Sequence, residues 1–509
     1  MSRLWRRSVL TTLAVLTMGC ASGPIDSIKK FTGGVSEDPT AGGTMIARYS
    51  KRDLDVAAMR AEQDRVLKLQ RGNAVYGLVY APEFHAYLET VVRRLVAKSP
   101  RADLPARAIL VTSRDWAADA TPPGLVFVPV GLIESLDNED QLAFILAHEI
   151  SHVLFRHHDS DWLVKSQKHA IAVGELGLAA RTVLERRPSQ SGSVSPTGLT
   201  AAKTVLLASD KIIAPAWSRN QESQADLLGI DIMIAAGYNP VGATDVLQKM
   251  VAWETAAGQA YREPPSDLVK QLSTLAADAG GKPSPPSSQP AIADLRRFFD
   301  VLGTEIARAV PDISRSHPKP EERLELSQDY LFREYRSLPP VEVSVRTWRT
   351  ALNRPQVQEV FGHYARAFEA RAKLADGDAR TAEGRAQASA QGFTSSHSFP
   401  RATLAEVYAR LNRTDRVIEN LRAALDAPEP ALETHLRLAA LHERGNRLPD
   451  ALRILELART RFADHPRAWP DLIRVYRRMG RTQDASALEL KCQVEFPDLR
   501  RLCAGAARS

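Results

Sequence analysis

Hydrophobic residues in the first third of the chain follow a helical spacing in some stretches and a strand-like pattern in others. The helical spacing begins near Asp53, in the run DLDVAAMRAEQDRVLKL, and returns from Pro82 to Ala97. Two short β-rich runs follow, AILVT at Ala108–Thr112 and GLVFVPV at Gly124–Val130. Because Pro129 has no backbone N–H to donate, the second run is expected to be an edge strand of a small sheet.

The middle of the chain predicts more helices, separated by two polar stretches. An apolar helix is expected over Glu139–His157, another over about 162–184, and a third from Glu222 to a stop at Gly237. The stretches 186–200 and 256–290 are rich in Ser, Gly and Pro, so they predict mobile loops.

After about residue 355 the pattern is helical throughout, and it repeats every 34 residues. Matching positions carry similar small or large side chains, as in Leu404, Leu438 and Leu472; Ala405, Ala439 and Ile473; Tyr408, His442 and Tyr476; and Val417, Ala451 and Ala485. A period of 34 residues is typical of tetratricopeptide repeats, which stack as helix pairs into a solenoid. The fold class predicted from the patterning is therefore mainly α with a small β-sheet, ending in an α-solenoid.

Composition indicates a globular chain of several domains. The 509 residues are 44% hydrophobic and 25% charged, and one compact core rarely serves such a length. The net charge of +7 is spread along helical segments without a dense basic tract. That distribution favours ordinary surface solvation, and nucleic-acid binding is not expected.

The N-terminus predicts export. Residues 1–20 combine three arginines, a short apolar run and small residues, which is the pattern of an export signal. Cys20 follows Gly19 and stands where bacterial lipoprotein precursors carry their lipidated cysteine, although Thr17 departs from the usual Leu, Val or Ile. A lipoprotein and a soluble secreted protein both stay open. Residues 21–50 are expected to be a flexible tether.

Two further cysteines, Cys492 and Cys503, lie close together near the C-terminus. An even number of cysteines in an exported protein favours a disulfide between them, the alternative being two free buried thiols.

The sequence HEISH supplies the candidate chemistry. His148 and His152 are four residues apart, so a helix places both imidazoles on one face, where they can hold one Zn²⁺. Glu149 can then act as general base on a water molecule. Relative to His148, the later His157 and His158 project elsewhere on an ideal helix, and they are expected to be surface residues.

A second acidic pair follows in the run ESQAD. Glu222 can be the third zinc ligand, and Asp226, one helical turn later, can accept a hydrogen bond from the free imidazole N–H of a ligand histidine. Two solvated carboxylates would be the ordinary interpretation of this stretch alone, but the HEISH motif makes a zinc site the better one.

With these motifs in hand, the chain from about residue 53 to 325 resembles the HtpX/Oma-type gluzincin metallopeptidases. The resemblance rests on PPGLVFVPVGLIESLDNEDQLAFILAHEISH, on ESQAD followed by GYNP, and on SHPKPEER. With an export signal before it and repeats after it, the chain is most similar to the periplasmic BepA-like branch. The resemblance implies a zinc metalloprotease domain over 51–340 and a helical tetratricopeptide-repeat domain over 355–500.

The resemblance also implies roles for two more residues. His317 matches a histidine near the zinc, which either blocks the resting site or assists catalysis, and Arg323 matches an arginine that orders this region. The implied function is a zinc-dependent endopeptidase acting on misfolded or misassembled polypeptides of the bacterial envelope.

The implied location and partners follow from the same branch. The protein is expected in the periplasm, held at the outer membrane if Cys20 is lipidated, with its repeats bound to the outer-membrane protein assembly machinery. The alternative is a chaperone-like docking module whose protease site is held shut.

Overall fold

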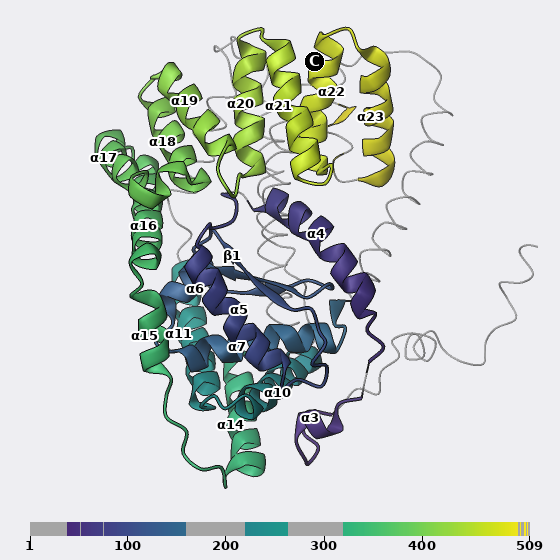
Figure 1. The fold of residues 1–509 in the computed structure, drawn as a ribbon, viewed down its shortest axis with the longest axis vertical. Helices are drawn as coiled ribbons and strands as arrows, with labels where there is room; N and C mark the ends of the chain where they lie inside the picture. The colour runs from purple at the N-terminus through teal and green to yellow at the C-terminus, as the bar shows by residue number, and fades with distance from the viewer. Residues whose placement is uncertain are drawn as a thin grey trace, which may run out of the picture.

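The computed structural model describes residues 38–50, 52–74, 76–158, 219–262 and 319–496, together with 499, 503, 504 and 506. Several predictions made from the sequence lie outside this set: the export signal with Cys20, the helix at 162–184, the loop at 186–200, most of the loop at 256–290, and His317. Among the described residues the fold is mostly helical with one small sheet (Figure 1).

The sheet has three strands in the order β1-β3-β2. β1 (Arg107–Val111) pairs in parallel with β3 (Leu125–Pro129), and β2 (Asp119–Ala120) pairs antiparallel with the other side of β3. The prediction that the Pro129 strand is an edge strand was therefore wrong. Because β2 pairs only with Val126 and Phe127, Pro129 lies beyond that pairing and its missing N–H costs no hydrogen bond.

Helices pack around this sheet and bury the largest apolar cluster of the described chain. The first helices are α3 (Met45–Arg48), α4 (Val56–Asn73), α5 (Pro82–Val96), α6 (Val130–Ser135) and α7 (Glu139–Leu154). After residue 218 come α10 (Arg219–Ala235), α11 (Val241–Arg262), α14 (Pro320–Tyr335) and α15 (Val345–Leu352). The start of the predicted loop at 256–290 is thus helical, as the end of α11.

Helix α7 is held at its N-terminus by a cap and two buried carboxylates. The Asn138 side chain accepts a hydrogen bond from the Gln141 N–H. Glu139 accepts hydrogen bonds from the hydroxyls of Tyr87 and Tyr238 at 2.9 and 3.1 Å. The carboxylates of Glu139 and Asp140, in the first turn, also complement the positive end of the helix dipole.

The neighbouring Asp140 ties α7 to two other segments. Its carboxylate accepts the backbone N–H of Asn239 at 2.8 Å and that of Ser344 at 2.6 Å. Because Asp140 is fully buried and hydrogen-bonded, α7 has a fixed position relative to the turn after α10 and the segment before α15.

The predicted tether is packed over its last residues. Met45 is fully buried, the backbone N–H of Ile46 donates to Asp231 at 2.6 Å, and the Tyr49 hydroxyl donates to the Leu154 carbonyl at 2.8 Å. Residues 45–49 are therefore part of the folded domain, since their apolar side chains find a partner surface on α10 and α7 that a sequence pattern does not reveal.

The second half of the described chain is a row of helix pairs that curves over the first half (Figure 1). The pairs are α16 (Pro355–Ala375) with α17 (Ala379–Ser389), α18 (Ser398–Arg410) with α19 (Thr414–Leu425), α20 (Leu432–Arg444) with α21 (Leu448–Arg461), and α22 (Trp469–Arg478) with α23 (Thr482–Glu495). Short 3₁₀ turns, η1 (Gly392–Ser396) and η2 (Pro466–Ala468), precede α18 and α22.

All twelve residues that mark the 34-residue period are buried. Each period corresponds to one helix pair from α18 onward, and each pair contacts the next. A stack of helix pairs is thus present, whereas its assignment to the tetratricopeptide repeats stays a prediction. A disulfide joins Cys492 of the last helix to Cys503.

The helix pairs are docked on α4. His465 Nε2 lies 2.8 Å from the Asn73 side-chain oxygen, and Arg71 forms a 2.7 Å ion pair with Glu429. Gly72 permits this approach, because a Cβ there would lie 2.5 Å from His465 Cδ2. Throughout the described chain, no helix has both the length and the apolar character needed to cross a membrane.

Candidate metal centre

Two elements bring three potential metal ligands together. His148 and His152 lie on α7, and their Nε2 atoms are 3.1 Å apart. Glu222 comes from the first turn of α10, with its carboxylate oxygens 3.7 Å from His148 Nε2 and 3.8 Å from His152 Nε2. The three ligand atoms lie within 4.8 Å of one another, so the structure places the predicted set around one point.

The donor set fits a small divalent cation. Ligand atoms about 2.0–2.1 Å from a tetrahedral Zn²⁺ lie about 3.3 Å from each other. The two Nε2 atoms are 3.1 Å apart, and Glu222 Oε2 and Oε1 lie 3.7 Å from His148 Nε2 and 3.8 Å from His152 Nε2, so the spacings are close to that value. Two imidazole nitrogens and one carboxylate oxygen are typical ligands of catalytic zinc, which leaves a position open for water or substrate.

Gly229 allows α10 to lie against α7. A Cβ at this position would be 3.0 Å from the backbone nitrogen of His148 and 3.2 Å from its Cα. Because glycine has no side chain, the two helix backbones approach closely where the first ligand is attached, and Glu222 reaches the histidines.

Asp226 and Arg323 support the ligands from the opposite side. Asp226 Oδ1 lies 2.9 Å from His148 Nδ1, within hydrogen-bond distance of the nitrogen that a carboxylate contacts when it orients a ligand histidine. The Arg323 guanidinium, from α14, donates to both Asp226 oxygens at 2.8 and 2.7 Å and lies 3.0 Å from Glu222. One buried cation therefore contacts two buried carboxylates, and the ordering role that the resemblance implies for Arg323 stays a prediction.

The surroundings of the two histidines shift their pKa values in opposite directions. Burial lowers the pKa of His148, but the hydrogen bond and charge of Asp226 outweigh it and raise that pKa above its usual value. Burial, with His148 and His157 nearby, holds the pKa of His152 well below its usual range. Burial raises the pKa of Asp226, yet Arg323 prevails and lowers it to about 2.

Glu149 lies buried beside the ligands, with 9% of its surface exposed. Burial raises the pKa of its carboxyl to about 8, and the charges of Asp119 and Glu222 act in the same direction. A bound divalent cation would oppose this shift by attracting the carboxylate. A buried carboxyl whose pKa is raised by its surroundings is a candidate for a general acid–base role.

The prediction that His157 is a surface residue was wrong. It is 5% exposed, its Nδ1 lies 2.9 Å from His152 Nδ1, and its Nε2 lies 3.3 Å from Gln224 Oε1. The helical projection failed because α7 ends at Leu154 and the chain then turns back. The signal available in the sequence was the third histidine itself, five residues after a ligand. His158 is partly exposed.

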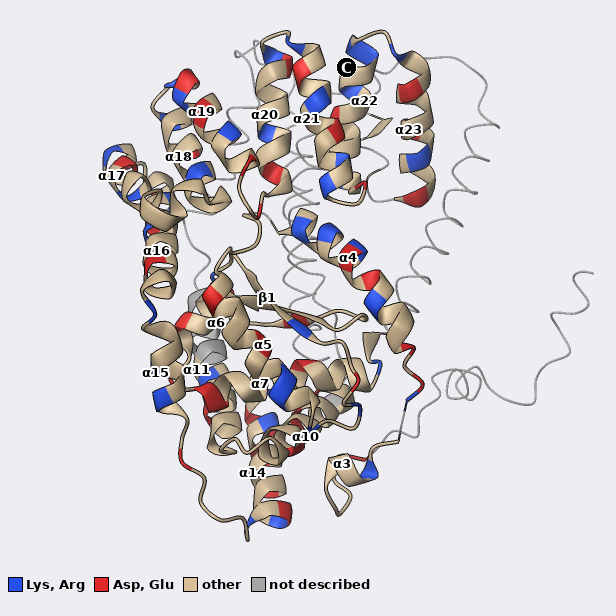
Figure 2. Ribbon diagram, in the orientation of Figure 1, with Lys and Arg blue, Asp and Glu red and all other residues tan. Residues whose placement is uncertain are grey.

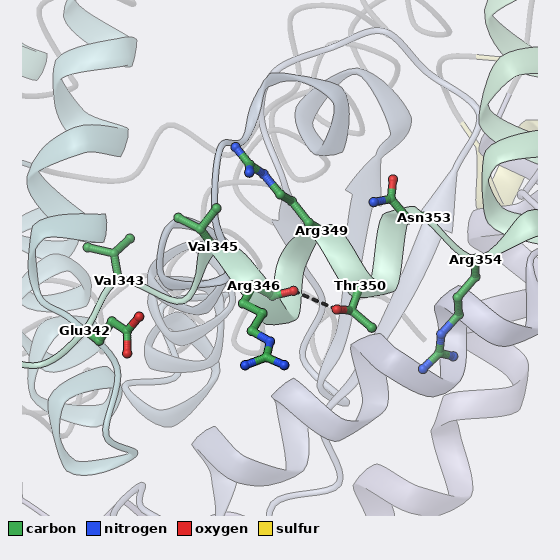
Figure 3. Close-up of a pocket in the computed structure, with 8 residues that line it drawn as sticks. All are labelled: Glu342, Val343, Val345, Arg346, Arg349, Thr350, Asn353 and Arg354. Atoms are coloured by element: carbon green, nitrogen blue, oxygen red, sulfur yellow. Dashed lines mark hydrogen bonds between the residues drawn. The ribbon is translucent and has the colours of Figure 1, made fainter.

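A surface pocket elsewhere is unrelated to this site (Figure 3). It lies along α15 and is lined by Glu342, Val343, Val345, Arg346, Arg349, Thr350, Asn353 and Arg354. It shares no residue with the metal group. Figure 2 shows acidic and basic residues interspersed along the helices, in line with the dispersed charge of the sequence.

Comparison with known proteins agrees with the geometry. Residues 82–329 match the model of peptidase family M48, a segment that contains HEISH, ESQAD and Arg323. The chain is 30% identical over 173 residues to a beta-barrel assembly-enhancing protease of Yersinia pestis, covering 34% of each chain. It is 27% identical over 188 residues to the Escherichia coli K12 protein of the same name, covering 37% of this chain and 36% of that one.

A mitochondrial relative aligns as well. The chain is 29% identical over 190 residues to the mitochondrial metalloendopeptidase OMA1 of Schizosaccharomyces pombe, covering 36% of this chain and half of the relative. The similarity thus spans about a third of the two bacterial relatives. Members of this family are metal-dependent peptidases, and the segment that matches the family model holds all three candidate metal ligands. Residues 82–329 thus resemble peptidase family M48, and the group His148, His152 and Glu222 lies within that segment.

Proposed function

We propose that the protein is a zinc-dependent endopeptidase that hydrolyses peptide bonds in polypeptide substrates. The observation that carries the proposal is the convergence of two imidazoles and one carboxylate, with the buried Glu149 one residue after the first ligand. The match to a metallopeptidase family over the same residues supports it.

In the proposed reaction the zinc ion polarises the substrate and the side chains of the protein transfer the proton and position the ligands. When bound, the zinc ion supplies Lewis-acid polarisation of the scissile carbonyl and lowers the pKa of water. Glu149 accepts the proton of the attacking water and passes it to the leaving nitrogen. Asp226 orients His148, and Arg323 holds Asp226 and Glu222 in place.

The sheet offers a place for an extended substrate. Within the described residues β1 and β2 are the two edge strands, and Leu78 forms a bridge with Val111 of β1. Asp119 of β2 is close enough to Glu149 to raise the pKa of that carboxyl. Pairing of a substrate with β2 would lay the peptide along the metal centre by β-augmentation.

The test is a comparison of wild type and Glu149→Gln on an unfolded polypeptide such as casein, with zinc content measured for both. We expect the variant to keep its zinc and to lose at least about 100-fold in cleavage rate, because general-base catalysis contributes about 10²–10⁴-fold. Glu419→Gln, on the exposed face of α19, is the matched control. Equal rates for wild type and Glu149→Gln would refute the proposal.

The cellular role is proposed from the relatives and the N-terminus. Two relatives are named beta-barrel assembly-enhancing proteases, which supports a role in the quality control of envelope proteins. In this proposal the protein lies in the periplasm, attached to the outer membrane if Cys20 is lipidated. The helix pairs, which we assign to tetratricopeptide repeats, recruit the assembly machinery. Capture of partners by a chain lacking residues 400–499 would contradict that recruitment.

A docking module with a closed protease site is the second proposal, favoured by the extended stack of helix pairs docked on α4. His317, outside the described residues, would then act as the group that closes the site. Cleavage that appears only in His317→Ala would support a self-inhibited enzyme. Cleavage by wild type that exceeds cleavage by His317→Ala would instead assign His317 to catalysis.

A further inference from the structure

The two metal-binding histidines have different partners behind them. His148 Nδ1 faces a carboxylate, Asp226, whereas His152 Nδ1 faces the ring of another histidine, His157, at 2.9 Å. A carboxylate commonly accepts the hydrogen bond of a ligand imidazole. A second imidazole can accept that hydrogen bond only if its facing nitrogen carries no proton.

The position of the proton on each ring follows from which nitrogen of His152 binds the metal. The Nε2 atoms of His148 and His152 point toward Glu222, so Nε2 of His152 is the metal-binding atom. A neutral imidazole that binds a metal through Nε2 carries its proton on Nδ1. His152 Nδ1 is therefore the donor in its contact with His157, and His157 Nδ1 has to accept.

The second ring nitrogen of His157, Nε2, contacts Gln224. If Nδ1 accepts, the proton of a neutral His157 lies on Nε2, and Nε2 lies 3.3 Å from Gln224 Oε1, an atom that only accepts. Donor and acceptor therefore match at both contacts, from His152 through His157 to Gln224.

The backbone is shaped to place His157 there. After α7 ends, the His157 N–H donates to the His152 carbonyl at 3.0 Å, and Arg156 adopts a φ of 56° to allow the reversal. A positive φ is unfavourable for a residue other than glycine, so the surrounding contacts have to hold Arg156 in this conformation. The Phe155 ring stacks on the His157 ring at 5.3 Å between centroids. Both the turn and the stacking hold this imidazole behind the ligand.

We propose that His157 and Gln224 are positioning residues that fix the tautomer and the ring orientation of His152 for metal binding. The inference rests on the proposed function only in taking Zn²⁺ as the ion. Loss of a group that orients a ligand costs about 10–100-fold in metal affinity.

The experiment measures the zinc dissociation constant of the full chain by competition with a chelator. We expect His157→Ala to weaken zinc binding by about 10–100-fold. His157→Asn, whose side-chain oxygen can accept near the former Nδ1 position, should recover most of the affinity. Gln224→Leu should weaken binding by a smaller factor, and His363→Ala, on α16 away from the site, should leave it unchanged.

Stability and spectroscopy separate positioning from packing. The melting temperature of each metal-free variant is measured alongside, and a loss of zinc affinity without a matching loss of metal-free stability supports the proposal. In the zinc-loaded wild type, ¹⁵N spectra should show protons on His152 Nδ1 and His157 Nε2. If His157→Ala does not fold, Gln224→Leu and the spectra decide.

Three results would overturn the inference: unchanged zinc affinity in Gln224→Leu and His157→Ala, no recovery in His157→Asn, or a proton on His157 Nδ1. Failure of the proposed function is seen separately. A wild type that binds zinc and is no more active than Glu149→Gln refutes the protease proposal while leaving the affinity test intact.

Discussion

At the scale of single residues, Arg323 decides whether the metal centre can be buried. Asp226 is 1% exposed and Glu222 is 5% exposed, and both contact this one guanidinium. Two buried carboxylates that lie close together repel each other and lose their hydration. A guanidinium offsets both effects, because its planar set of N–H donors can contact both carboxylates. Arg323 therefore acts on stability as well as on ligand geometry.

Replacing Arg323 by Met tests this role. The variant leaves two buried carboxylates unpaired, and we expect the free energy of unfolding of the metal-free protein to fall by about 3–5 kcal/mol. Excess zinc should restore part of the loss, because the ion neutralises the same carboxylates. Urea unfolding with and without a chelator measures both effects.

Arg416→Met is the control, because Arg416 and Glu419 form an exposed ion pair. Its removal should change the free energy of unfolding by no more than about 1 kcal/mol. Similar losses for the two variants would show that the Arg323 contacts contribute no more than a surface pair.

At the scale of elements, the site depends on how closely α10 approaches α7. Each helix alone presents ligands on one face, but only their packing brings Glu222 to the histidines. Gly229 sets that distance, because the atoms that a Cβ would meet belong to the α7 backbone, which cannot rotate out of the way.

Gly229→Ala should therefore weaken zinc binding and destabilise the fold. We expect the free energy of unfolding to fall by about 1–3 kcal/mol, as for other overpacked positions. Chelator competition and urea unfolding measure the two quantities.

Gly384→Ala provides the matched control in α17, where a Cβ would meet nothing within 4 Å. There alanine should raise the free energy of unfolding by about 0.5–1 kcal/mol, through its better helix propensity. A neutral or stabilising Gly229→Ala would mean that the two helices are not in close contact at this point.

At the scale of the whole molecule, the docked helix pairs make stability sensitive to acid. His397, His435 and His465 are at most 5% exposed, and burial lowers the pKa of each to about 4. An unfolded histidine has a pKa of about 6.5, so the unfolded chain binds more protons between these values. The stability from these residues is complete above about pH 6.5 and is lost as pH falls toward 4.

Urea unfolding at pH 7.5 and pH 5 tests this dependence. Each of the three histidines should contribute roughly 2 kcal/mol less to the free energy of unfolding at pH 5. His435→Asn keeps a donor for the Ala431 carbonyl, which His435 Nδ1 contacts at 2.9 Å, and cannot titrate in this range. It should reduce the difference in the free energy of unfolding between the two pH values by roughly 2 kcal/mol, and an unchanged difference would rule out His435 as a contributor.

Prediction from the sequence worked best where the evidence was local. The HEISH spacing depends only on helical geometry, and ESQAD repeats the same spacing on a second helix. The 34-residue period is also local, since each helix pair packs mainly on its neighbours. Two predictions failed because they applied a local rule outside its range. The helical projection for His157 assumed a helix beyond Leu154, where α7 ends. The edge-strand prediction for Pro129 did not foresee β2, a partner strand of two residues.

The residues that can bind a metal, the glutamate beside them and the period of the helix pairs could be predicted from the amino-acid sequence, because they follow from side-chain chemistry and helical periodicity. The groups that contact these residues from behind became visible only in the folded protein. Arg323 reaches Glu222 and Asp226 from another helix, His157 turns back onto His152, and Gly229 lets α10 reach α7. Such contacts depend on where helices end and how closely they pack, which no spacing within one segment specifies.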